Sequence, residues 1–310
     1  MSTLSTPVDV PEIARLVALP PSIFVLGAHP VNTALIGAML GRNSAAFEFP
    51  HLNLFVTDTL EGLVTEMVDD GQSYLHGLLR AVAYIYGGEQ TIISVGMARR
   101  WIMRRLSRST SQVFDELRKG VEPLRLVDKS AIYSRDATCL ERILNAMPGA
   151  YFVHVIEHPL YPGAAIGQFK RDPPNADPRR ARDAISSRCQ LQWLQVQRMI
   201  SDALNDLAPD RLVVLRMESL LADPHREISD LCARLDLPND EVTVADMLHP
   251  ENSPFAGIGP VGANLGDDPA FLRDPRFSPQ RMLSLSARSP HRSKKMLPEV
   301  AQVAAHYDYH

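Results

Sequence analysis

Residues with acid–base side chains follow two apolar segments of this chain. His29 comes directly after "IFVLGA", and Glu157 and His158 come directly after "YFVHVI". An imidazole exchanges protons near neutral pH, and a carboxylate beside it can hold the ring in one orientation. If the two segments are neighbouring strands, the pattern indicates a histidine–carboxylate pair that serves as base and orienting group.

The loop that carries His29 has the layout of an anion-binding turn. A buried strand, Gly27, a tight loop containing Asn32 and a helix that begins at Thr33 would direct backbone N–H groups and the positive end of the helix dipole at an anion. The loop lacks the G-x-x-x-x-G-K-[ST] pattern of a nucleotide P-loop, and only Gly27 matches the G-x-G-x-x-G dinucleotide fingerprint. The sequence therefore argues against nucleoside triphosphatases and dinucleotide-dependent enzymes.

The elements that must position these residues alternate between short β-rich segments and longer segments of helical period. This pattern predicts an α/β fold with a parallel sheet covered by helices on both faces. "YFVHVI" and "RLVVLR" are almost continuously apolar, as expected of central parallel strands. The predicted strands are Ile23–Leu26, Arg125–Val127, Tyr151–Ile156 and Arg211–Leu215. The predicted helices are Thr33–Leu40, Ser73–Tyr86, Ser94–Arg105, Thr138–Ala146, Ala181–Leu207 and Pro224–Leu235.

The composition is that of a globular chain of 310 residues, 45% hydrophobic, with a formal net charge of -4. We expect a single domain over residues 1–310, with an N-terminal extension at 1–20 and irregular loops over the site at 170–183 and 249–277. Nothing in the charge indicates nucleic-acid binding. No apolar run reaches the roughly 18 residues of a membrane span, and the three cysteines cannot all pair within one chain. We therefore expect a cytoplasmic protein without a membrane segment.

Several short motifs follow one another along the chain: "GAHPVNTAL", "PHLNLF", "VDKSAIY" and "HVIEHP". Their order resembles that of the sulfotransferases that use 3'-phosphoadenosine 5'-phosphosulfate (PAPS), whose motifs resemble G-x-P-R-S-G-T-T-L, P-E-L-x-L-F, D-K-S/T-P-x-Y and a strand ending in R-H-P. "SPFAGIGPVGANLGDDPAFL" is similar to a loop of the branch that includes sulfotransferase domains of polyketide assembly lines. The resemblance spans most of the chain. It implies a P-loop-like, three-layer sulfotransferase fold with a central parallel sheet.

The chain departs from that family at the cofactor motifs. Pro30 stands at the arginine of the first motif, and Glu157 stands at the arginine that contacts the 3'-phosphate of PAPS. A carboxylate about 4 Å from a phosphate oxygen costs on the order of 4 kcal/mol at an effective dielectric constant of about 20. We therefore expect no PAPS cofactor, and interpret Glu157 either as part of a new site or as a strand-end carboxylate paired with an arginine.

The positions of the family's cofactor motifs nevertheless remain candidates for holding an oxyanion or a carboxylate. The resemblance makes Gly27, Asn32, Thr33, Lys129 and Ser130 the candidate cofactor-binding residues. For Lys129, a buried pair with Asp128 is the alternative to a cation in the crevice.

His51 stands at the glutamate of P-E-L, a candidate general base in the family. An imidazole retains the capacity to abstract a proton at neutral pH, and the alternative is a histidine packed at the rim after Pro50. The fold and the resemblance together bring four candidate catalytic residues toward one crevice at the carboxyl ends of the strands: His29, His51, Glu157 and His158. Their spacing is not that of a standard zinc site, so we expect no metal.

A basic segment, "ARRWIMRRLSR", lies outside these motifs. It places Arg100, Arg104 and Arg108 at i, i+4 spacing, which predicts either a solvated helix face or a docking stripe for an acidic acyl or peptidyl carrier protein.

The sequence and the resemblance lead to one hypothesis about function. We predict an enzyme of specialised metabolism, with a degenerate PAPS site, that performs acid–base chemistry on an acyl, polyketide or peptide intermediate, free or carrier-bound. Two alternatives stay open: a PAPS-dependent sulfotransferase of a small-molecule hydroxyl, and a non-catalytic binding protein of this fold.

Overall fold

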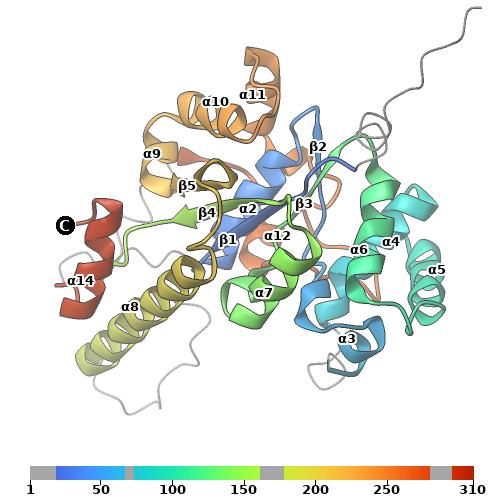
Figure 1. Ribbon diagram of the computed structural model, residues 1–310, viewed down its shortest axis with the longest axis horizontal. Coiled ribbons are helices and arrows are strands. Elements are labelled where there is room, and N and C mark those ends of the chain that lie inside the picture. The colour runs from blue at the N-terminus through green and yellow to red at the C-terminus, as the bar shows by residue number, and fades with distance from the viewer. Residues whose placement is uncertain (1–18, 67–72, 161–177, 280–294) are drawn as a thin grey trace, which may run out of the picture.

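The computed structural model describes residues 19–66, 73–160, 178–279 and 295–310. Within them, one parallel sheet has the strand order β2-β3-β1-β4-β5 (Figure 1). The strands are β1 (Ile23–Gly27), β2 (Ala46–Glu48), β3 (Arg125–Asp128), β4 (Tyr151–Ile156) and β5 (Leu212–Arg216). Because all five run in the same direction, the loops that follow them meet at one edge of the sheet.

Helices connect the strands. The described α-helices are α2 (Pro30–Leu40), α3 (Leu60–Glu66), α4 (His76–Gly87), α5 (Ile92–Met103), α6 (Thr110–Val121), α7 (Ala137–Ala146), α8 (Pro178–Ala203), α9 (Met217–Ala222), α10 (Pro224–Arg234), α11 (Glu241–Met247), α12 (Pro269–Arg273) and α14 (Pro298–Ala304). Short 3-10 helices lie at Leu54–Val56, Ser73–Leu75, Ala131–Ser134, Pro209–Arg211, Pro250–Asn252 and Ala305–Tyr307.

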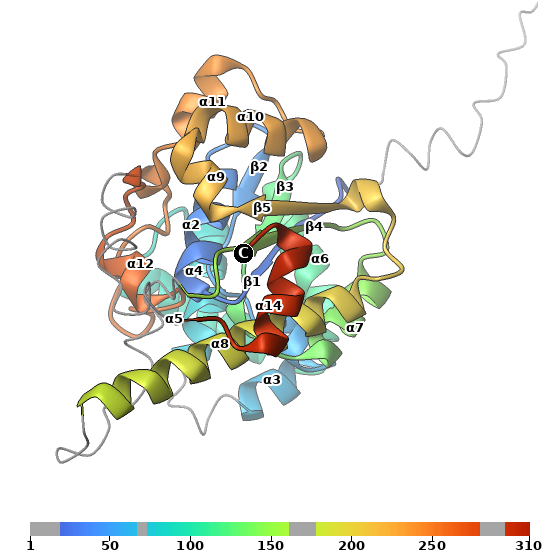
Figure 2. The same ribbon diagram turned by 90° about the vertical axis from the view of Figure 1, so that its left-hand side faces the viewer.

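The sheet is the middle of three layers. Ile23 and Val25 of β1 pack with α2, α10 and α11 on one face, whereas Phe24 and Leu26 pack with α4, α6 and α7 on the other. This division follows from the two-residue period of a strand, which sends successive side chains to opposite faces. Figure 2 shows α10 and α11 on one side of the sheet and α7 and α8 on the other. The α/β prediction is thereby confirmed.

The four predicted strands are confirmed to within one residue at each end, and β2 was not predicted. β2 has three residues, which is too short for a period-2 pattern to stand out. Helix α6 was also missed, although its capping box is visible in the sequence as Ser109 followed by Gln112.

The predicted loop at 170–183 is wrong in its second half. Residues 170–177 lie outside the described residues, but α8 already begins at Pro178. Proline is well suited to the first turn of a helix, because the N–H that it lacks would have no intrahelical partner there. The other predicted loop, 249–277, contains only two short helices and is otherwise irregular. The prediction of a single domain stays a prediction, and residues 1–18 lie outside the described residues.

Candidate active site

His29 and Glu157 are brought together by the pairing of β1 with β4. Gly27 is opposite Val155 in the sheet register. His29 and Glu157 each lie two positions beyond these paired residues, so they lie beside one another. α2 begins at Pro30 directly after His29, which makes the connection short. A side chain on Gly27 would not fit, because a Cβ there would lie 2.7 Å from the carbonyl oxygen of Val155.

The Glu157 carboxylate has protein partners on both oxygens. Oε1 contacts Nδ1 of His29, and Oε2 accepts a hydrogen bond of 2.7 Å from Nδ2 of Asn32 in the first turn of α2. Glu157 is 4% exposed, and a buried carboxylate is tolerated only when it is paired in this way. Its position at the N-terminus of α2 is also favourable for a negative charge. Among the described residues, the partners of the Glu157 carboxylate are thus a histidine and an asparagine and not the arginine of the alternative interpretation.

Neighbouring polar groups fix this arrangement. The Trp193 indole on α8 donates to the backbone carbonyl of Glu157 at 2.9 Å. Thr33 is fully buried and its hydroxyl donates to the carbonyl of Pro30 at 2.9 Å. The Gly27 amide donates to the Ser134 hydroxyl at 2.9 Å. The Thr33 hydroxyl and the Gly27 amide thus have partners inside the protein.

A second cluster surrounds Lys129, at the end of β3. Its Nζ lies 2.8 Å from Oε2 of Glu48 and 2.8 Å from Oδ2 of Asp267, and the side chains of Lys129 and Asp267 are fully buried. Gly37 of α2 leaves room for the lysine, since a Cβ there would lie 2.4 Å from Lys129 Cδ. The alternative pairing of Lys129 with Asp128 is wrong.

His51 belongs to this second cluster. Its Nε2 lies 3.2 Å from Oδ1 of Asp267, and its side chain is 15% exposed. Burial alone would raise the pKa of Asp267, but Lys129 and then His51 outweigh burial and hold that pKa below its ordinary value. Burial lowers the pKa of Lys129, and Asp267 and Glu48 more than reverse this effect. Lys129 and Asp267 are therefore both charged at neutral pH.

Ser130 takes part in a buried turn. Its amide and hydroxyl donate to Oδ1 of Asp128 at 2.9 and 2.6 Å, and its hydroxyl oxygen accepts from the Asn53 amide at 3.0 Å. Burial raises the pKa of Asp128 to about 6, and the hydrogen bonds from Ser130 oppose this shift. This turn joins the end of β3 to the segment that follows His51.

His158 lies apart from the other candidates. Its backbone amide donates to Glu218 at 2.8 Å, its Nδ1 accepts from the Leu160 amide at 3.1 Å, and its ring packs edge-on against Tyr309 with 5.2 Å between centroids. Burial lowers the pKa of His158. The four predicted residues therefore do not form one set of contacts: His29 meets Glu157, His51 meets Asp267, and His158 contacts the C-terminal segment.

The basic stripe is shorter than predicted. α5 ends at Met103, and beyond it the carbonyls of Leu106 and Arg108 accept hydrogen bonds from the amides of Glu61 and Leu60 at the start of α3. Arg108 is therefore not on the helix, and it pairs with Glu116 of α6. Arg100 and Arg104 are exposed at the end of α5.

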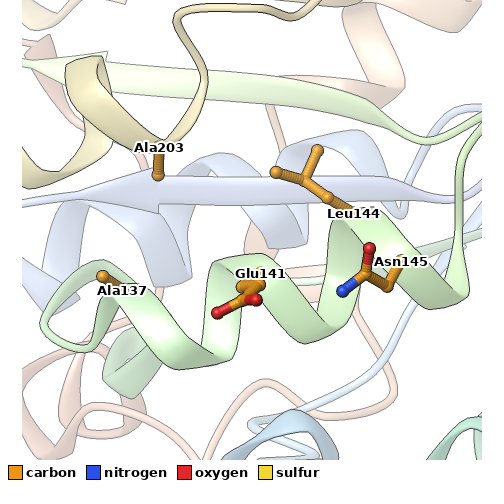
Figure 3. A pocket seen from close by; sticks show the side chains of 5 residues that line it. All are labelled: Ala137, Glu141, Leu144, Asn145 and Ala203. Atoms are coloured by element: carbon orange, nitrogen blue, oxygen red, sulfur yellow. The ribbon is translucent and has the colours of Figure 1, made fainter.

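A shallow depression of ≈ 330 Å³ lies between α7 and α8 (Figure 3). Its lining residues are Ala137, Glu141, Leu144, Asn145 and Ala203. None of the predicted site residues lines it. In the part of the chain that the structure describes, no group of three or more His, Cys, Asp or Glu side chains is placed to hold a metal ion. Among the same residues, no helix has the length and apolar character needed to cross a membrane.

Two residues of the second cluster were missed by sequence reasoning. Glu48 ends β2, a strand that was not predicted, so no signal marked it. Asp267 lies in the "GDDP" of the irregular segment 249–277, which was expected over the site. The density of Gly and Asp in that segment was the available signal for Asp267.

Comparisons with known proteins agree with this architecture. A family model described as "Sulfotransferase family" matches residues 21–241. The sulfotransferase domain from the curacin biosynthetic pathway superposes with a TM-score of 0.72 at 23% identity, covering 94% of this chain and 99% of that chain. The sulfotransferase domain from the Synechococcus PCC 7002 olefin synthase gives a TM-score of 0.71 at 21% identity, covering 94% and 96%. No curated protein matches the chain. The two solved structures have the same fold as this chain.

Proposed function

The chain belongs to the sulfotransferase family, and on that premise we propose that it is an enzyme that no longer uses PAPS. In this proposal it performs acid–base chemistry on an acyl, polyketide or peptide intermediate of specialised metabolism. His51 is the general base, and the His29–Glu157 pair is a second proton-exchanging group in which Glu157 orients His29.

One observation carries the proposal: the Glu157 carboxylate, bound by His29 and Asn32 at the N-terminus of α2. The family resemblance puts the phosphates of PAPS beside this helix end. A phosphate oxygen about 4 Å from a carboxylate would be repelled by roughly 4 kcal/mol at an effective dielectric constant of about 20. At about 1.4 kcal/mol per factor of ten, this repulsion weakens binding by close to three powers of ten.

The remaining cofactor positions add to this misfit. Pro30 has no backbone N–H to offer, and the Thr33 hydroxyl already donates to a carbonyl. Lys129 is fully buried between Glu48 and Asp267, so its charge is neutralised inside the protein. PAPS therefore does not fit the residues present, and no catalytic step is assigned to it.

The two histidine–carboxylate pairs support acid–base chemistry. An imidazole can accept and return a proton near neutral pH, and a neighbouring carboxylate fixes its orientation. His29, His51 and Glu157 follow β1, β2 and β4 of the same sheet, at the carboxyl edge where open α/β sheets bind ligands.

The proposed substrate class rests on likeness to other proteins. The two solved structures are sulfotransferase domains of the curacin pathway and of an olefin synthase. We extend from them to an acyl, polyketide or peptide substrate, free or attached to a carrier protein. An acidic carrier would dock at Arg100 on α5 and Arg104 directly after it, where two exposed positive charges lie four residues apart.

The deciding experiment is a calorimetric titration with 3'-phosphoadenosine 5'-phosphate, at moderate salt so that nonspecific attraction to phosphate is screened. We expect no binding up to millimolar nucleotide. Micromolar binding would overturn the proposal and restore a PAPS-dependent sulfotransferase acting on a hydroxyl.

A second arm separates an enzyme from a non-catalytic binding protein. Once a carrier-bound or free acyl substrate gives turnover, His51→Ala and Glu157→Ala should each lower kcat by about 10²–10⁴-fold, the usual contribution of a general acid or base. Turnover that survives both changes would remove the two residues from the mechanism.

A further inference from the structure

We propose that Asp267 is the positioning residue for His51, holding the ring through Nε2 so that Nδ1 accepts the proton of the substrate. The inference rests on the proposed function only in the role it gives to Nδ1. The His51–Asp267 pair itself can be tested without a substrate.

The backbone brings the two residues together. The His51 amide donates to the carbonyl of Gly266 at 2.7 Å, which sets Asp267 beside the imidazole. Gly266 has φ +104, and a Cβ there would lie 2.6 Å from the amide nitrogen of Gly77. A Cβ on Gly77 would in turn lie 2.1 Å from the carbonyl oxygen of His51. The backbones of the segments around His51, Gly77 and Gly266 are therefore in direct contact, which is possible because two of these residues are glycines without a side chain.

The loop that carries Asp267 is also fixed from α4. The buried Arg80 guanidinium donates to the carbonyls of Phe255, Gly257 and Leu265 at 3.0, 3.2 and 3.2 Å. Three hydrogen bonds from the planar Arg80 guanidinium therefore hold both ends of the segment 255–265. Asp267 therefore follows a segment that is fixed to the body of the protein.

Charge keeps Asp267 suited to this role. Its Oδ2 lies 2.8 Å from Lys129 Nζ, while Oδ1 is turned toward His51. The lysine keeps the carboxylate ionised, so Oδ1 can accept an N–H from the ring and stabilise the imidazolium after His51 takes up a proton.

Burial indicates which edge of the His51 ring meets a substrate. Nε2 is buried and lies beside Asp267, whose side chain is fully buried, so the exposed 15% of the His51 side chain belongs to atoms other than Nε2. The contact of 3.2 Å between Nε2 and Oδ1 falls outside regular hydrogen-bond geometry. Such contacts often tighten when a substrate binds. The arrangement leaves Nδ1 as the nitrogen for proton transfer.

The test is a proton and nitrogen NMR spectrum of the full chain with ¹⁵N-labelled histidine. We expect a slowly exchanging Nε2–H signal and an unprotonated Nδ1 signal for His51, assigned by their loss in His51→Gln. In Asp267→Asn the Nε2–H signal should be lost to solvent exchange. Lys129 keeps Glu48 as its partner in this variant, so the fold should persist.

Asp268→Asn is the matched control, since Asp268 is the neighbouring carboxylate and caps α12 through the amides of Ala270 and Phe271. It should leave the His51 signals unchanged. A His51 proton on Nδ1 in the wild type, or an Nε2–H that persists in Asp267→Asn, would overturn the inference. If the nucleotide titration shows micromolar binding while these NMR results hold, the pair stands and the proposed function fails.

Discussion

At the scale of single residues, the two histidine–carboxylate pairs are stabilised in different ways. Glu157 is balanced by hydrogen bonds and by the N-terminus of α2. Asp267 is balanced by a full positive charge on Lys129. Because Lys129 serves two buried carboxylates, it is the residue on which the second cluster depends.

Replacing Lys129 tests this dependence. Lys129→Met keeps the length of the side chain but leaves Glu48 and Asp267 buried without their cation. Removing one partner of a buried ion pair costs about 3–5 kcal/mol, so the free energy of unfolding should fall by that amount. Urea denaturation measures it.

The exposed Lys119 of α6 provides the control. Lys119→Met should change the free energy of unfolding by less than about 0.5 kcal/mol. An equally small effect for Lys129→Met would mean that water or neighbouring groups solvate the two carboxylates.

At the scale of elements, β4 joins the sheet core to the site, and it carries a buried histidine. His154 is 2% exposed, its Nε2 has no hydrogen-bond partner among the described residues, and its ring packs edge-on against Tyr307. Burial lowers the pKa of His154 to about 4, although Gln197 and Glu157 act in the opposite direction. The folded state therefore strongly prefers the neutral ring.

This preference predicts a pH dependence of stability. Below the ordinary histidine pKa of about 6.5, His154 takes up a proton in the unfolded chain but stays neutral in the folded protein. The contribution of His154 to the free energy of unfolding is therefore complete above that pH, and it falls until the folded pKa of about 4 is reached. The loss at pH 4 should be on the order of 3 kcal/mol.

Urea denaturation of His154→Phe between pH 7 and pH 4 should show a correspondingly shallower decline than the wild type. His225→Phe, at an exposed position of α10, should keep the wild-type slope. Parallel curves for wild type and His154→Phe would show that another group causes the decline.

At the scale of the whole molecule, the exposed end of α5 and the site are joined through one loop. Arg99 of α5 donates to the carbonyl of Gly262 at 2.7 Å, and Gly266 and Asp267 of the same loop contact His51. A partner docked on α5 would therefore lie on a helix that contacts the loop that holds the proposed base.

Charge reversal tests the docking proposal. In Arg100→Glu/Arg104→Glu the affinity for a holo acyl carrier protein should fall at least tenfold, and the wild-type affinity should fall with added salt, because exposed charge pairs are screened. Surface plasmon resonance measures both. Arg226→Glu reverses an exposed charge on α10, across the sheet, and should have no effect. Equal affinities for all three proteins would place the carrier elsewhere or exclude it.

The fold class could be predicted from the sequence alone, and the three histidines and Glu157 of the candidate site could be singled out there. A short, almost continuously apolar segment such as Tyr151–Ile156 indicates a buried strand, and the local motif around Gly27 predicts a strand, a turn and a helix. Both signals arise from residues near one another in the chain, where periodicity and turn chemistry act.

The partners of the candidate side chains could not be predicted from the sequence, because they come from distant parts of the chain. Glu157 bonds to His29 across 128 positions, and Lys129 pairs with Glu48 and Asp267, which lie on a strand too short to predict and in an irregular loop. The end of α5 at Met103, which removed Arg108 from the basic stripe, was likewise not predictable from the sequence. A buried charged group is stable only when it is paired, but the order of the strands and the packing of distant loops determine which residue becomes the partner.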